Sequence, residues 1–440
     1  MKIAYITAGA GNMYCGSCLR DNTLAAALMD AGHDVLLIPT YTPTRTDERN
    51  VSLNRVFLGG INVYLQQHFE LFRKTPAILD RLWDFTPLLR FTTRWGISVD
   101  PARLGRLTVS MLQGSRGLLR KEITKLVRYL ADEVAPDIVN IPNSLLISLA
   151  PAIKAEMNVP ICCTLQGEDL FLDNLGEPFR SESLRMIREH SSHVDAFVAV
   201  SDFGARSMVK YLGIEKERIH VVPLGINFDG YGAPTGTAPE PFAIGYLARI
   251  APEKGLHVLC GAYRRLRSRT GIPESRLYVA GYLAPEHKPY LANIRNNMAS
   301  WGLSGHFHYH GELDRSAKLS FLRSLSVFSV PGPYDDPKGL FLLEAMAAGI
   351  PVIQPRCGAF TEMVENTGGG VLVEQNNPDA LADGILKLWN DRSLRTELGA
   401  RGYEGVRTYY TSANMSMKAL QVFSSLLPQR DRIVACGPRE

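Results

Sequence analysis

The 440-residue sequence has no long apolar run and no strong excess of charge. Its apolar stretches stay below the roughly 18 residues that a membrane-spanning helix needs, so no such helix is expected. The formal net charge is only +4, far from the basic balance of most nucleic-acid-binding proteins, so no nucleic-acid partner is expected. The start of the chain, MKIAYITAGAG, lacks the apolar core of a signal peptide. We therefore expect a cytoplasmic protein.

Cysteine is scarce and irregularly spaced. The seven cysteines are an odd number without regular spacing, which suits a reducing compartment better than a disulfide framework. Cys15 and Cys18 form a Cys-x-x-Cys motif, but a second pair of comparable spacing is missing, and a zinc site needs about four ligands. We favour a structural or substrate-lining loop around this motif, with redox or metal control as the alternative.

The order of apolar runs and glycines predicts the fold class. KIAYITA ends in glycines, and TLAAALMDAGHDVLLIPTY follows as a helix, a glycine break and a second strand. This is the opening of a βαβ unit, which builds parallel sheets. The same alternation returns after the insertion described below and restarts at FAIGYLARIAPEKG. We predict an α/β protein with two doubly wound, Rossmann-like domains facing across a cleft, with ligands at the carboxyl ends of the strands.

The domain boundaries follow from changes in composition. The segment FDGYGAPTGTAPEP is rich in Gly, Pro, Thr and Ala and lacks an apolar period, as is typical of a linker. The expected parts, in order, are a first domain at 1–228, a linker at 229–241, a second domain at 242–410, a C-terminal helix at 411–428 and a tail at 429–440.

The first domain contains an insertion at about 60–130 in which aromatic and basic residues alternate. A helical subdomain whose aromatic residues form its own core is the simplest interpretation. Such a surface also suits the interface of an anionic bilayer, and hence peripheral contact with the inner face of a membrane, an acceptor sugar or a dimer contact. These alternatives stay open, and the sequence does not indicate an oligomeric state.

The segment PYDDPKGLFLLEAMAAGIPVIQP carries the strongest site pattern. Asp336 and Glu344 stand eight positions apart, with Lys338 and Gly339 between them at the start of an apolar run. The first N–H groups of a helix suit a phosphate or sugar hydroxyls, and two carboxylates can accept hydrogen bonds from two sugar rings. The alternative is an amphipathic helix with Asp336 as its solvated cap.

A second pattern supplies positive charge. In GYLARIAPEKGLHVL, Arg249 and Lys254 occupy one loop after a predicted strand. Arginine binds phosphate oxygens in a bidentate manner and lysine adds a point charge, so the pair could neutralise a diphosphate. Two surface cations in a polar loop are the alternative.

The two patterns together resemble the retaining glycosyltransferases of family 4, which have the glycosyltransferase-B fold. GHDVLLIPTY, DAFVAVSDF, RIHVVPLGIN and GAFTEMVENTGGGVLVEQ match further blocks of that family in order, so the resemblance covers about 350 of the 440 residues. It implies transfer of a hexose from a UDP-, GDP- or ADP-sugar to a hydroxyl of a sugar, lipid-linked or small-molecule acceptor. It also implies a front-face mechanism, no cofactor and no bound metal, an acceptor-binding first domain, and a last helix that crosses back to that domain.

The resemblance assigns roles to the residues of the second domain. Arg249 and Lys254 would bind the donor diphosphate, Glu344 the ribose and Asp336 the transferred sugar. Lys338 and the backbone N–H groups near Gly339 and Leu340 would hold the phosphate and the sugar. The sequence departs from the family where Asp336 replaces a glutamate and Lys338 a phenylalanine, which puts the sugar preference in doubt.

In the first domain, Gly9 and Gly11 would let the backbone approach a ligand closely. Gln166 stands where the family often has a histidine, so it can form hydrogen bonds but cannot titrate. The candidates for acceptor or sugar contact are Gln166, Glu168, Asp169, Arg20 and Asp21. For Glu168 and Asp169 the alternative is a pair of residues that cap a helix N-terminus. For Arg20 and Asp21 the alternative is a pair of charges on the surface.

Two alternatives to a glycosyltransferase remain at this point. One is another enzyme of the same fold, such as a sugar-phosphate synthase, a phosphorylase or a nucleotide-sugar epimerase. The other is a protein that binds a nucleotide sugar without turnover.

Overall fold

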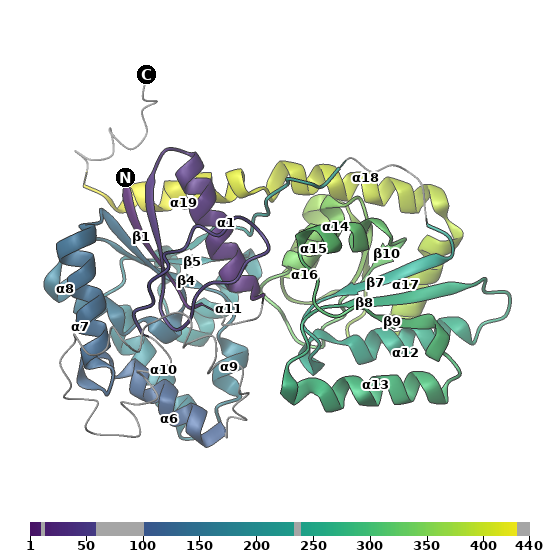
Figure 1. The fold of residues 1–440 in the computed structure, drawn as a ribbon, viewed down its shortest axis with the longest axis horizontal. Coiled ribbons are helices and arrows are strands. Elements are labelled where there is room, and N and C mark those ends of the chain that lie inside the picture. Colours follow the sequence, from purple (N-terminus) through teal and green to yellow (C-terminus); the bar gives the residue numbers. More distant parts are fainter. Residues whose placement is uncertain (10–13, 59–100, 233–238, 429–440) are drawn as a thin grey trace. The chain divides into compact units, whose positions relative to one another are not determined.

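The computed structural model describes residues 1–9, 14–58, 101–232 and 239–428. The chain divides into two compact units. Unit 1 consists of Met1–Pro223 with Ser412–Glu440, and unit 2 of Leu224–Thr411 (Figure 1). Gly11 and the aromatic part of the predicted insertion, residues 59–100, lie outside the described residues.

Unit 1 is built on a six-stranded parallel sheet of order β2-β1-β3-β4-β5-β6. Its strands are short and, except for the partly exposed edge strand β6, mostly buried on both faces, as in sheets that helices cover on both sides. The strands are β1 (Lys2–Thr7), β2 (Asp34–Pro39), β3 (Ile138–Ile141), β4 (Ile161–Leu165), β5 (Ala196–Ala199) and β6 (Ile219–Val221). The helices are α1 (Gly16–Asp30), α6 (Pro101–Leu112), α7 (Arg120–Arg128), α8 (Leu149–Glu156), α9 (Asp169–Asp173), α10 (Phe179–Ser191), α11 (Asp202–Leu212) and α19 (Ser412–Leu426).

Alternation along β1 gives unit 1 one apolar cluster on each face of its sheet. Ile3 and Tyr5 pack in a cluster with Leu28 of α1 and Phe423 of α19. Ala4 and Ile6 point to the opposite face, where α6, α7, α8 and α10 contribute the other cluster. The last helix of the chain therefore completes the core of the first unit.

Unit 2 repeats the same architecture, with a parallel sheet of order β12-β11-β10-β7-β8-β9. The strands are β7 (Phe242–Leu247), β8 (Ser275–Ala280), β9 (Phe307–Tyr309), β10 (Val327–Phe328), β11 (Val352–Pro355) and β12 (Gly370–Val373). The helices are α12 (Leu256–Arg267), α13 (Lys288–Ser300), α14 (Arg315–Arg323), α15 (Leu340–Ala347), α16 (Gly358–Thr367), α17 (Pro378–Asn390) and α18 (Arg392–Tyr409). The predicted fold class of two doubly wound α/β domains is confirmed.

Each sheet has one point where the strand order reverses. In unit 1 the chain places β2 on one side of β1 and β3 to β6 on the other. In unit 2 it places β8 and β9 on one side of β7 and β10 to β12 on the other. Ligands of doubly wound sheets bind at such switch points, outside the carboxyl ends of the strands. Ligand sites are therefore expected at the loops that follow β1 and β3 in unit 1 and β7 and β10 in unit 2.

The division between the units lies before the predicted linker. Unit 2 begins at Leu224, whereas the linker was expected from residue 229. The reason is a set of contacts that hold this segment to unit 2: the Ile226 N–H donates to the Tyr410 carbonyl, and Arg315 donates to the carbonyls of Asn227 and Asp229. Composition indicates where a linker lies in the sequence but does not show these contacts.

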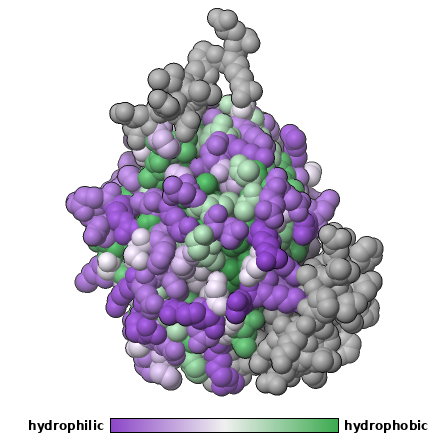
Figure 2. Space-filling view, turned by 90° about the vertical axis from the view of Figure 1, so that its left-hand side faces the viewer, coloured by the Kyte–Doolittle hydropathy of each residue, from purple (hydrophilic) through white to green (hydrophobic). Residues whose placement is uncertain are grey.

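The surface is mixed in character. Hydrophilic side chains cover much of the face drawn in Figure 2, with apolar ones interspersed among them. Within the described residues, no helix combines the length and the apolar character that crossing a bilayer requires.

Candidate functional site

A buried ion pair lies at the switch point of unit 2. Lys254 ends a short 3-10 turn after β7, and Asp336 lies in the loop after β10. Lys254 Nζ is 2.5 Å from Asp336 Oδ2, and the two side chains are 17% and 2% exposed. Because β7 and β10 are neighbours in a parallel sheet, their carboxyl ends bring together two residues that are 82 positions apart.

Asp336 is held by more than its lysine. Its Oδ1 accepts a hydrogen bond from the Lys338 N–H at 3.0 Å, and its backbone carbonyl accepts one from Ala359 at 2.9 Å. Burial acts to raise the pKa of Asp336, but the charges of Lys254 and Lys338 hold that pKa below its ordinary value. The residue is 1% exposed, so the alternative of a solvated helix cap is wrong.

Two glycines allow the loops around this pair to approach each other. Gly255 has φ +71°, and a Cβ there would lie 2.0 Å from the Pro331 carbonyl oxygen. Gly358 has φ +50°, and its Cβ would lie 2.4 Å from the Asp336 carbonyl oxygen. No L side chain fits at either distance, so both positions need glycine for space as well as for conformation.

Arg249 lies in the same β7 loop but makes a different contact. Its guanidinium is 2.5 Å from Glu253 Oε1, and the two side chains are 44% and 23% exposed. An exposed ion pair of this kind contributes little to stability. Arg249 is therefore a solvent-accessible cation next to the segment that carries the partly buried Lys254.

The α15 helix begins at Leu340 with Gly339 as its N-cap, which matches the predicted start of a helix near Gly339. A Cβ on Gly339 would lie 2.8 Å from Met363 Sδ. Glu344 is the fifth residue of α15, and its Oε1 accepts a short hydrogen bond from Lys318 of α14. Both members of this second pair are buried, so Glu344 sits in a charged but enclosed position.

Sequence reasoning missed three residues of the unit 2 site: Glu253, Lys318 and Gly358. Glu253 follows Arg249 by four positions, a spacing at which opposite charges pair on helices. The sequence could therefore have indicated this ion pair. Lys318 lies on a different helix from Glu344, and no spacing rule connects the two. Gly358 opens α16 and was visible only as one glycine among 38.

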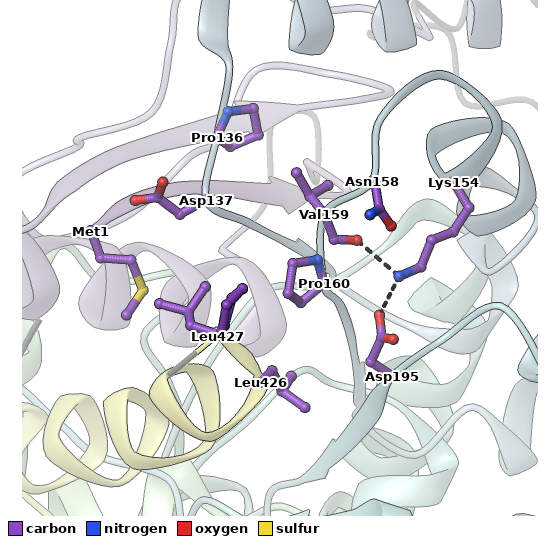
Figure 3. A pocket seen from close by; sticks show the side chains of 11 residues that line it. Met1, Pro136, Asp137, Lys154, Asn158, Val159, Pro160, Asp195, Leu426 and Leu427 are labelled. Atoms are coloured by element: carbon purple, nitrogen blue, oxygen red, sulfur yellow. Dashed lines mark hydrogen bonds and ion pairs between the residues drawn. The ribbon is translucent and has the colours of Figure 1, made fainter. Parts of the chain in front are cut away.

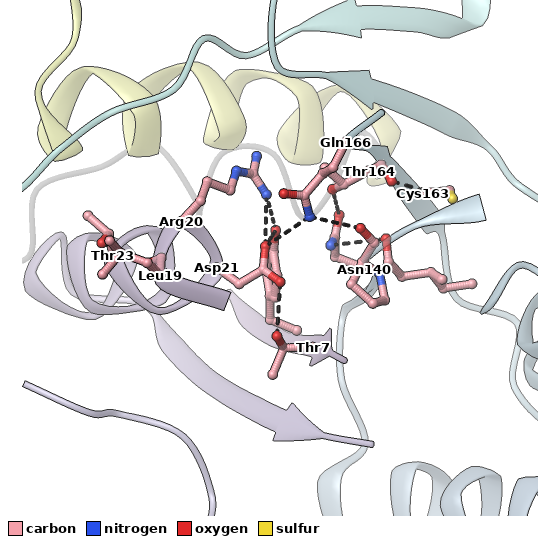
Figure 4. A network of polar contacts seen from close by, with 12 residues as sticks. Thr7, Leu19, Arg20, Asp21, Thr23, Asn140, Cys163, Thr164 and Gln166 are labelled. Atoms are coloured by element: carbon pink, nitrogen blue, oxygen red, sulfur yellow. Dashed lines mark hydrogen bonds and ion pairs between the residues drawn. The ribbon is translucent and has the colours of Figure 1, made fainter. Parts of the chain in front are cut away.

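The switch point of unit 1 holds a network of buried polar side chains (Figure 4). Thr7 Oγ1 donates to Asp21 Oδ2 at 2.9 Å, and Tyr5 Oη donates to Asp21 Oδ1 at 3.3 Å. Arg20 donates to Asp21 Oδ1 at 3.3 Å and makes a short bond to Tyr5 Oη. Burial raises the pKa of Asp21 to about 6, against the opposing charge of Arg20.

Gln166 joins this network from the end of β4. Its Nε2 donates to the Pro142 carbonyl at 3.0 Å and reaches Asp21 Oδ1 at 3.5 Å, across 145 positions of sequence. Its Oε1 is buried without a hydrogen-bond partner among the described residues. The structure thus brings Arg20, Asp21 and Gln166 together as expected for one site. Arg20 and Asp21 are each 1% exposed, so the alternative of a surface pair is wrong.

The other predicted residues of unit 1 that the structure describes lie at the start of α9 and in the loop after β1. Glu168 stands at the N-cap of α9 but makes no side-chain cap bond; its carboxylate instead accepts from the N–H groups of Gln166 and Ser144. Asp169 is the first residue of α9. Gly9 has φ +76°, and its Cβ would lie 1.9 Å from the Thr42 carbonyl oxygen, so it is required for packing between two loops.

The Cys-x-x-Cys motif lies at the start of α1. Cys15 is the N-cap and Cys18 the third helical residue, and neither is in a disulfide. Among the described residues, no group of three or more His, Cys, Asp or Glu side chains could hold a metal ion. Within the described part of the chain, the two thiols therefore lack the further ligands that a zinc site needs.

A cavity of about 590 Å³ lies at the opposite, amino-terminal edge of the unit 1 sheet (Figure 3). Met1, Asp137 and Pro160 line it just before β1, β3 and β4, together with the end of α19. Lys154 and Asp195 form a 2.7 Å ion pair on its wall. Since ligands of doubly wound sheets bind at the carboxyl edge, this cavity is a poor candidate for the main site.

Two family models match adjoining parts of the chain. The model "Glycosyl transferases group 1" matches residues 232–405, and the model "Glycosyltransferase Family 4" matches residues 90–229. The first match contains Arg249, Lys254, Asp336 and Glu344. The second contains Gln166, Glu168 and Asp169.

The curated relatives that match part of the chain are also named as glycosyltransferases. The phosphatidyl-myo-inositol mannosyltransferase of Mycobacterium tuberculosis is 29% identical over 220 residues, which cover 48% of this chain and 55% of the relative. The D-inositol 3-phosphate glycosyltransferase of Jonesia denitrificans is 28% identical over 237 residues, which cover 50% of this chain and 55% of the relative. The chain thus spans about half the length of the curated relatives it matches.

Solved structures share the fold at low identity. The sucrose-phosphate synthase of Thermosynechococcus elongatus superposes with a TM-score of 0.70 at 18% identity, over 96% of this chain and 98% of that one. Anabaena HepE in complex with UDP superposes with a TM-score of 0.67 at 17% identity, over 97% and 100%. The solved structures show that the fold is shared, and the two adjoining family matches, which together span most of the chain, show that it belongs to the family 4, group 1 glycosyltransferases.

Proposed function

We propose that the protein is a retaining glycosyltransferase that moves a hexose from a nucleotide diphosphate sugar to a hydroxyl group of a sugar, lipid-linked or small-molecule acceptor. The observation that carries this proposal is the Lys254–Asp336 pair at the switch point of unit 2, within the group 1 match. The names of the mannosyltransferase relatives and the UDP complex of HepE support a nucleotide-sugar donor.

Lys254 would stabilise the leaving diphosphate. A lysine ammonium has three N–H donors, and Asp336 takes one of them at 2.5 Å. Asp336 thereby orients the ammonium without using all of its hydrogen-bonding capacity. Because the Lys254 side chain keeps 17% of its surface exposed, its remaining donors can meet phosphate oxygens as negative charge develops on them.

Arg249 and the start of α15 would hold the rest of the diphosphate. The exposed Arg249 guanidinium can exchange Glu253 for two phosphate oxygens in a bidentate contact. The first N–H groups of α15, near Leu340, add donors and the positive end of a helix dipole. Together with Lys338, these groups supply the positive charge that a metal ion provides in other transferases, so we propose that transfer proceeds without one.

The carboxylates would then act in two ways. Glu344, which shares Lys318, would accept hydrogen bonds from the ribose of the donor through its remaining lone pairs. Asp336 was expected to contact the transferred sugar. Because it is 1% exposed and bonded through both side-chain oxygens, we now propose that it positions Lys254 and the Lys338 backbone.

Retention is proposed from the family likeness, with a front-face displacement. In this mechanism the leaving phosphate oxygen takes the proton of the acceptor hydroxyl, which then bonds to the anomeric carbon on the face that the phosphate leaves. Asp336 is 1% exposed and bonded through both side-chain oxygens, so it lacks the free approach that a nucleophile needs, which supports this route over a covalent intermediate on that residue. Trapping of a sugar on any carboxylate of the protein would disprove it.

The test is a thermal-shift panel with UDP, GDP, ADP and their hexose conjugates, in the presence of EDTA. A ligand at about 100 times its dissociation constant adds near 2.7 kcal/mol to the free energy of unfolding. We expect one nucleotide to raise the melting temperature clearly and Lys254→Ala to abolish the shift. No shift with any nucleotide would contradict the proposal. Binding without nucleotide release, over a panel of hydroxyl acceptors, would indicate a protein that binds the donor without turnover.

Turnover gives the second test. With the preferred donor and an acceptor found by screening, Lys254→Ala should lower kcat by about 10²-fold or more, as removal of a charge-stabilising donor does in other enzymes. The matched control is Lys387→Ala, which removes an equally long cation from α17, outside the proposed site. Equal kcat values for the two variants would show that Lys254 does not stabilise the leaving diphosphate.

A further inference from the structure

The Cys-x-x-Cys motif is not used by the proposed transfer. It follows β1 and opens α1, at the switch point of unit 1. Cys15, the N-cap, has extended backbone angles of φ −108° and ψ 126°, and Cys18 lies within the first turn. Residues three apart at a helix start lie on one face, so the two side chains are neighbours. Cys15 is partly exposed, and Cys18 is 2% exposed beneath it.

The two thiols contact each other and a buried carboxylate network. Interaction with the Cys15 thiol and burial both raise the pKa of Cys18, whereas interaction with the Thr7 hydroxyl acts to lower that pKa. The Thr7 hydroxyl in turn donates to Asp21 Oδ2 at 2.9 Å. The partly exposed Cys15 thus interacts with Cys18, Cys18 with Thr7, and Thr7 with the buried Asp21, whose carboxylate is a place for the Cys18 proton to go.

The other described cysteines lack this arrangement. Among the six cysteines that the structure describes, Cys15 alone is partly exposed. Cys162 and Cys163 are consecutive on β4, so their side chains point to opposite faces of the sheet. Cys260 lies in α12 and Cys357 at the start of α16, each buried.

We propose that Cys15 and Cys18 are a reversible redox site, which closes to a disulfide with low-molecular-weight disulfides such as oxidised glutathione. The Cys15 thiolate, favoured by the positive end of α1, attacks one sulfur of the oxidant and releases one thiolate, which takes up a proton. Cys18 loses its proton toward the Thr7–Asp21 network and attacks Cys15 Sγ, releasing the second thiol. Two protein thiols are oxidised and one small disulfide is reduced to two thiols.

The geometry suits ring closure. A disulfide needs Cα atoms about 4.4 to 6.8 Å apart, and residues three apart at the start of a helix meet that range. Cys15 is outside the helical backbone conformation, so it can move toward Cys18 while α1 stays intact. Burial of Cys18 protects it from the oxidant, which leaves Cys15 as the point of attack and Cys18 as the resolving thiol.

The experiment uses the full-length protein equilibrated with mixtures of reduced and oxidised glutathione, then alkylated and digested with trypsin. Cleavage after Lys2 and Arg20 gives the peptide 3–20, which contains Cys15 and Cys18 and no other cysteine. We expect a form without alkyl groups, lighter by the two thiol hydrogens, to increase with the proportion of oxidised glutathione and to disappear on reduction. Two alkyl groups at every ratio, or a stable glutathione adduct without ring closure, would overturn the proposal.

Two variants test the order of attack, with thermal melting as the check that they fold. Cys18→Ser should stop at a glutathione adduct on Cys15, because the resolving thiol is gone. Cys15→Ser should leave Cys18 unmodified over the time in which the unaltered protein closes its disulfide. Cys260→Ser is the matched control and should close the disulfide normally. Modification of Cys18 in Cys15→Ser at the unaltered rate would refute the assigned roles.

Discussion

The two switch points each centre on a buried aspartate with a cation, yet they have opposite electrostatics. In unit 1, burial outweighs Arg20 and raises the pKa of Asp21 to about 6. In unit 2, Lys254 and Lys338 outweigh burial and hold the pKa of Asp336 below its ordinary value. The difference arises from the number of charges around each carboxylate: Asp336 faces two cations, and Asp21 faces one.

Access differs as much as charge. Arg20 is 1% exposed and is committed to Tyr5 and Asp21. Lys254 and Arg249 both keep a surface open to solvent. A cation that is enclosed with its carboxylate holds the fold together, whereas a cation with one open side can meet an anionic ligand. The comparison supports placing the diphosphate at unit 2. Arg20 and Asp21 form an enclosed pair, and the acceptor contact expected of them stays a prediction.

The largest expected effect is on stability after removal of Lys254. Lys254→Ala leaves Asp336 buried without its main partner, and breaking a buried pair costs about 3–5 kcal/mol. Arg249→Ala is the matched control, because its pair with Glu253 is exposed, and it should change the free energy of unfolding by less than about 0.5 kcal/mol. Urea unfolding of both variants measures the difference. Similar losses would mean that the two cations are equivalent.

The second prediction concerns pH. The folded-state pKa of Asp21 is about 6, against 3.8 as the ordinary value, so its stabilising contribution is present below about pH 4 and is lost as the pH rises through 6. The loss amounts to about 3 kcal/mol for a shift of about two units. Asp21→Asn should remove this dependence, so its unfolding midpoint relative to the unaltered protein should improve between pH 4 and 7.

Asp336 should show the opposite dependence. Its pKa is lowered in the folded state, so the stability it contributes is present at neutral pH and is lost as the pH falls through that lowered pKa. The loss of stability caused by Asp336→Asn, relative to the unaltered protein, should therefore be largest at neutral pH. If the stabilities of the Asp21→Asn and Asp336→Asn variants changed with pH in the same direction, the proposed difference between the two switch points would be wrong.

The third prediction tests the packing of the Lys254 loop. Gly255 and Gly271 have φ of +71° and +76°, but a Cβ meets the Pro331 carbonyl at 2.0 Å in the first case and open space in the second. Gly255→Ala should lower the free energy of unfolding by about 1–3 kcal/mol more than Gly271→Ala does. Both substitutions strain the backbone, but only the first places a Cβ against a carbonyl oxygen. Gly255→Ala should also weaken nucleotide binding. Equal midpoints in urea would show that the loop moves aside freely.

The smallest expected effect is on Arg249. Glu253→Gln removes the carboxylate that competes with phosphate for its guanidinium. An exposed pair is worth up to about 1 kcal/mol, so nucleotide affinity should rise by no more than about fivefold. Calorimetric titration measures this change, with Glu286→Gln, an acidic residue of another loop of unit 2, as the control. Weaker binding in Glu253→Gln would show that Glu253 positions Arg249 for the ligand.

The sequence predicted what depends on periodicity and on strand ends. Apolar runs and glycines indicated the two doubly wound sheets, and the loop after β7 was expected to carry Lys254. Burial was harder to foresee: the adjacent Arg20 and Asp21 look like a surface pair until Tyr5 and Thr7 of the neighbouring strand enclose them. Contacts between separate helices, such as Lys318 with Glu344, depend on side-chain directions that a linear pattern does not contain.

The placement of α19 has a consequence for the order of synthesis. Leu24 and Leu28 of α1 belong to a cluster that also contains Met415 and Phe423 of α19. The ribosome delivers α19 only after all 188 residues of Leu224–Thr411, which takes roughly 10 to 40 seconds at about 5–20 residues per second. During that interval the part of the α1 face that packs on α19 remains uncovered on the nascent chain. The first unit to be translated is thus the last to be completed.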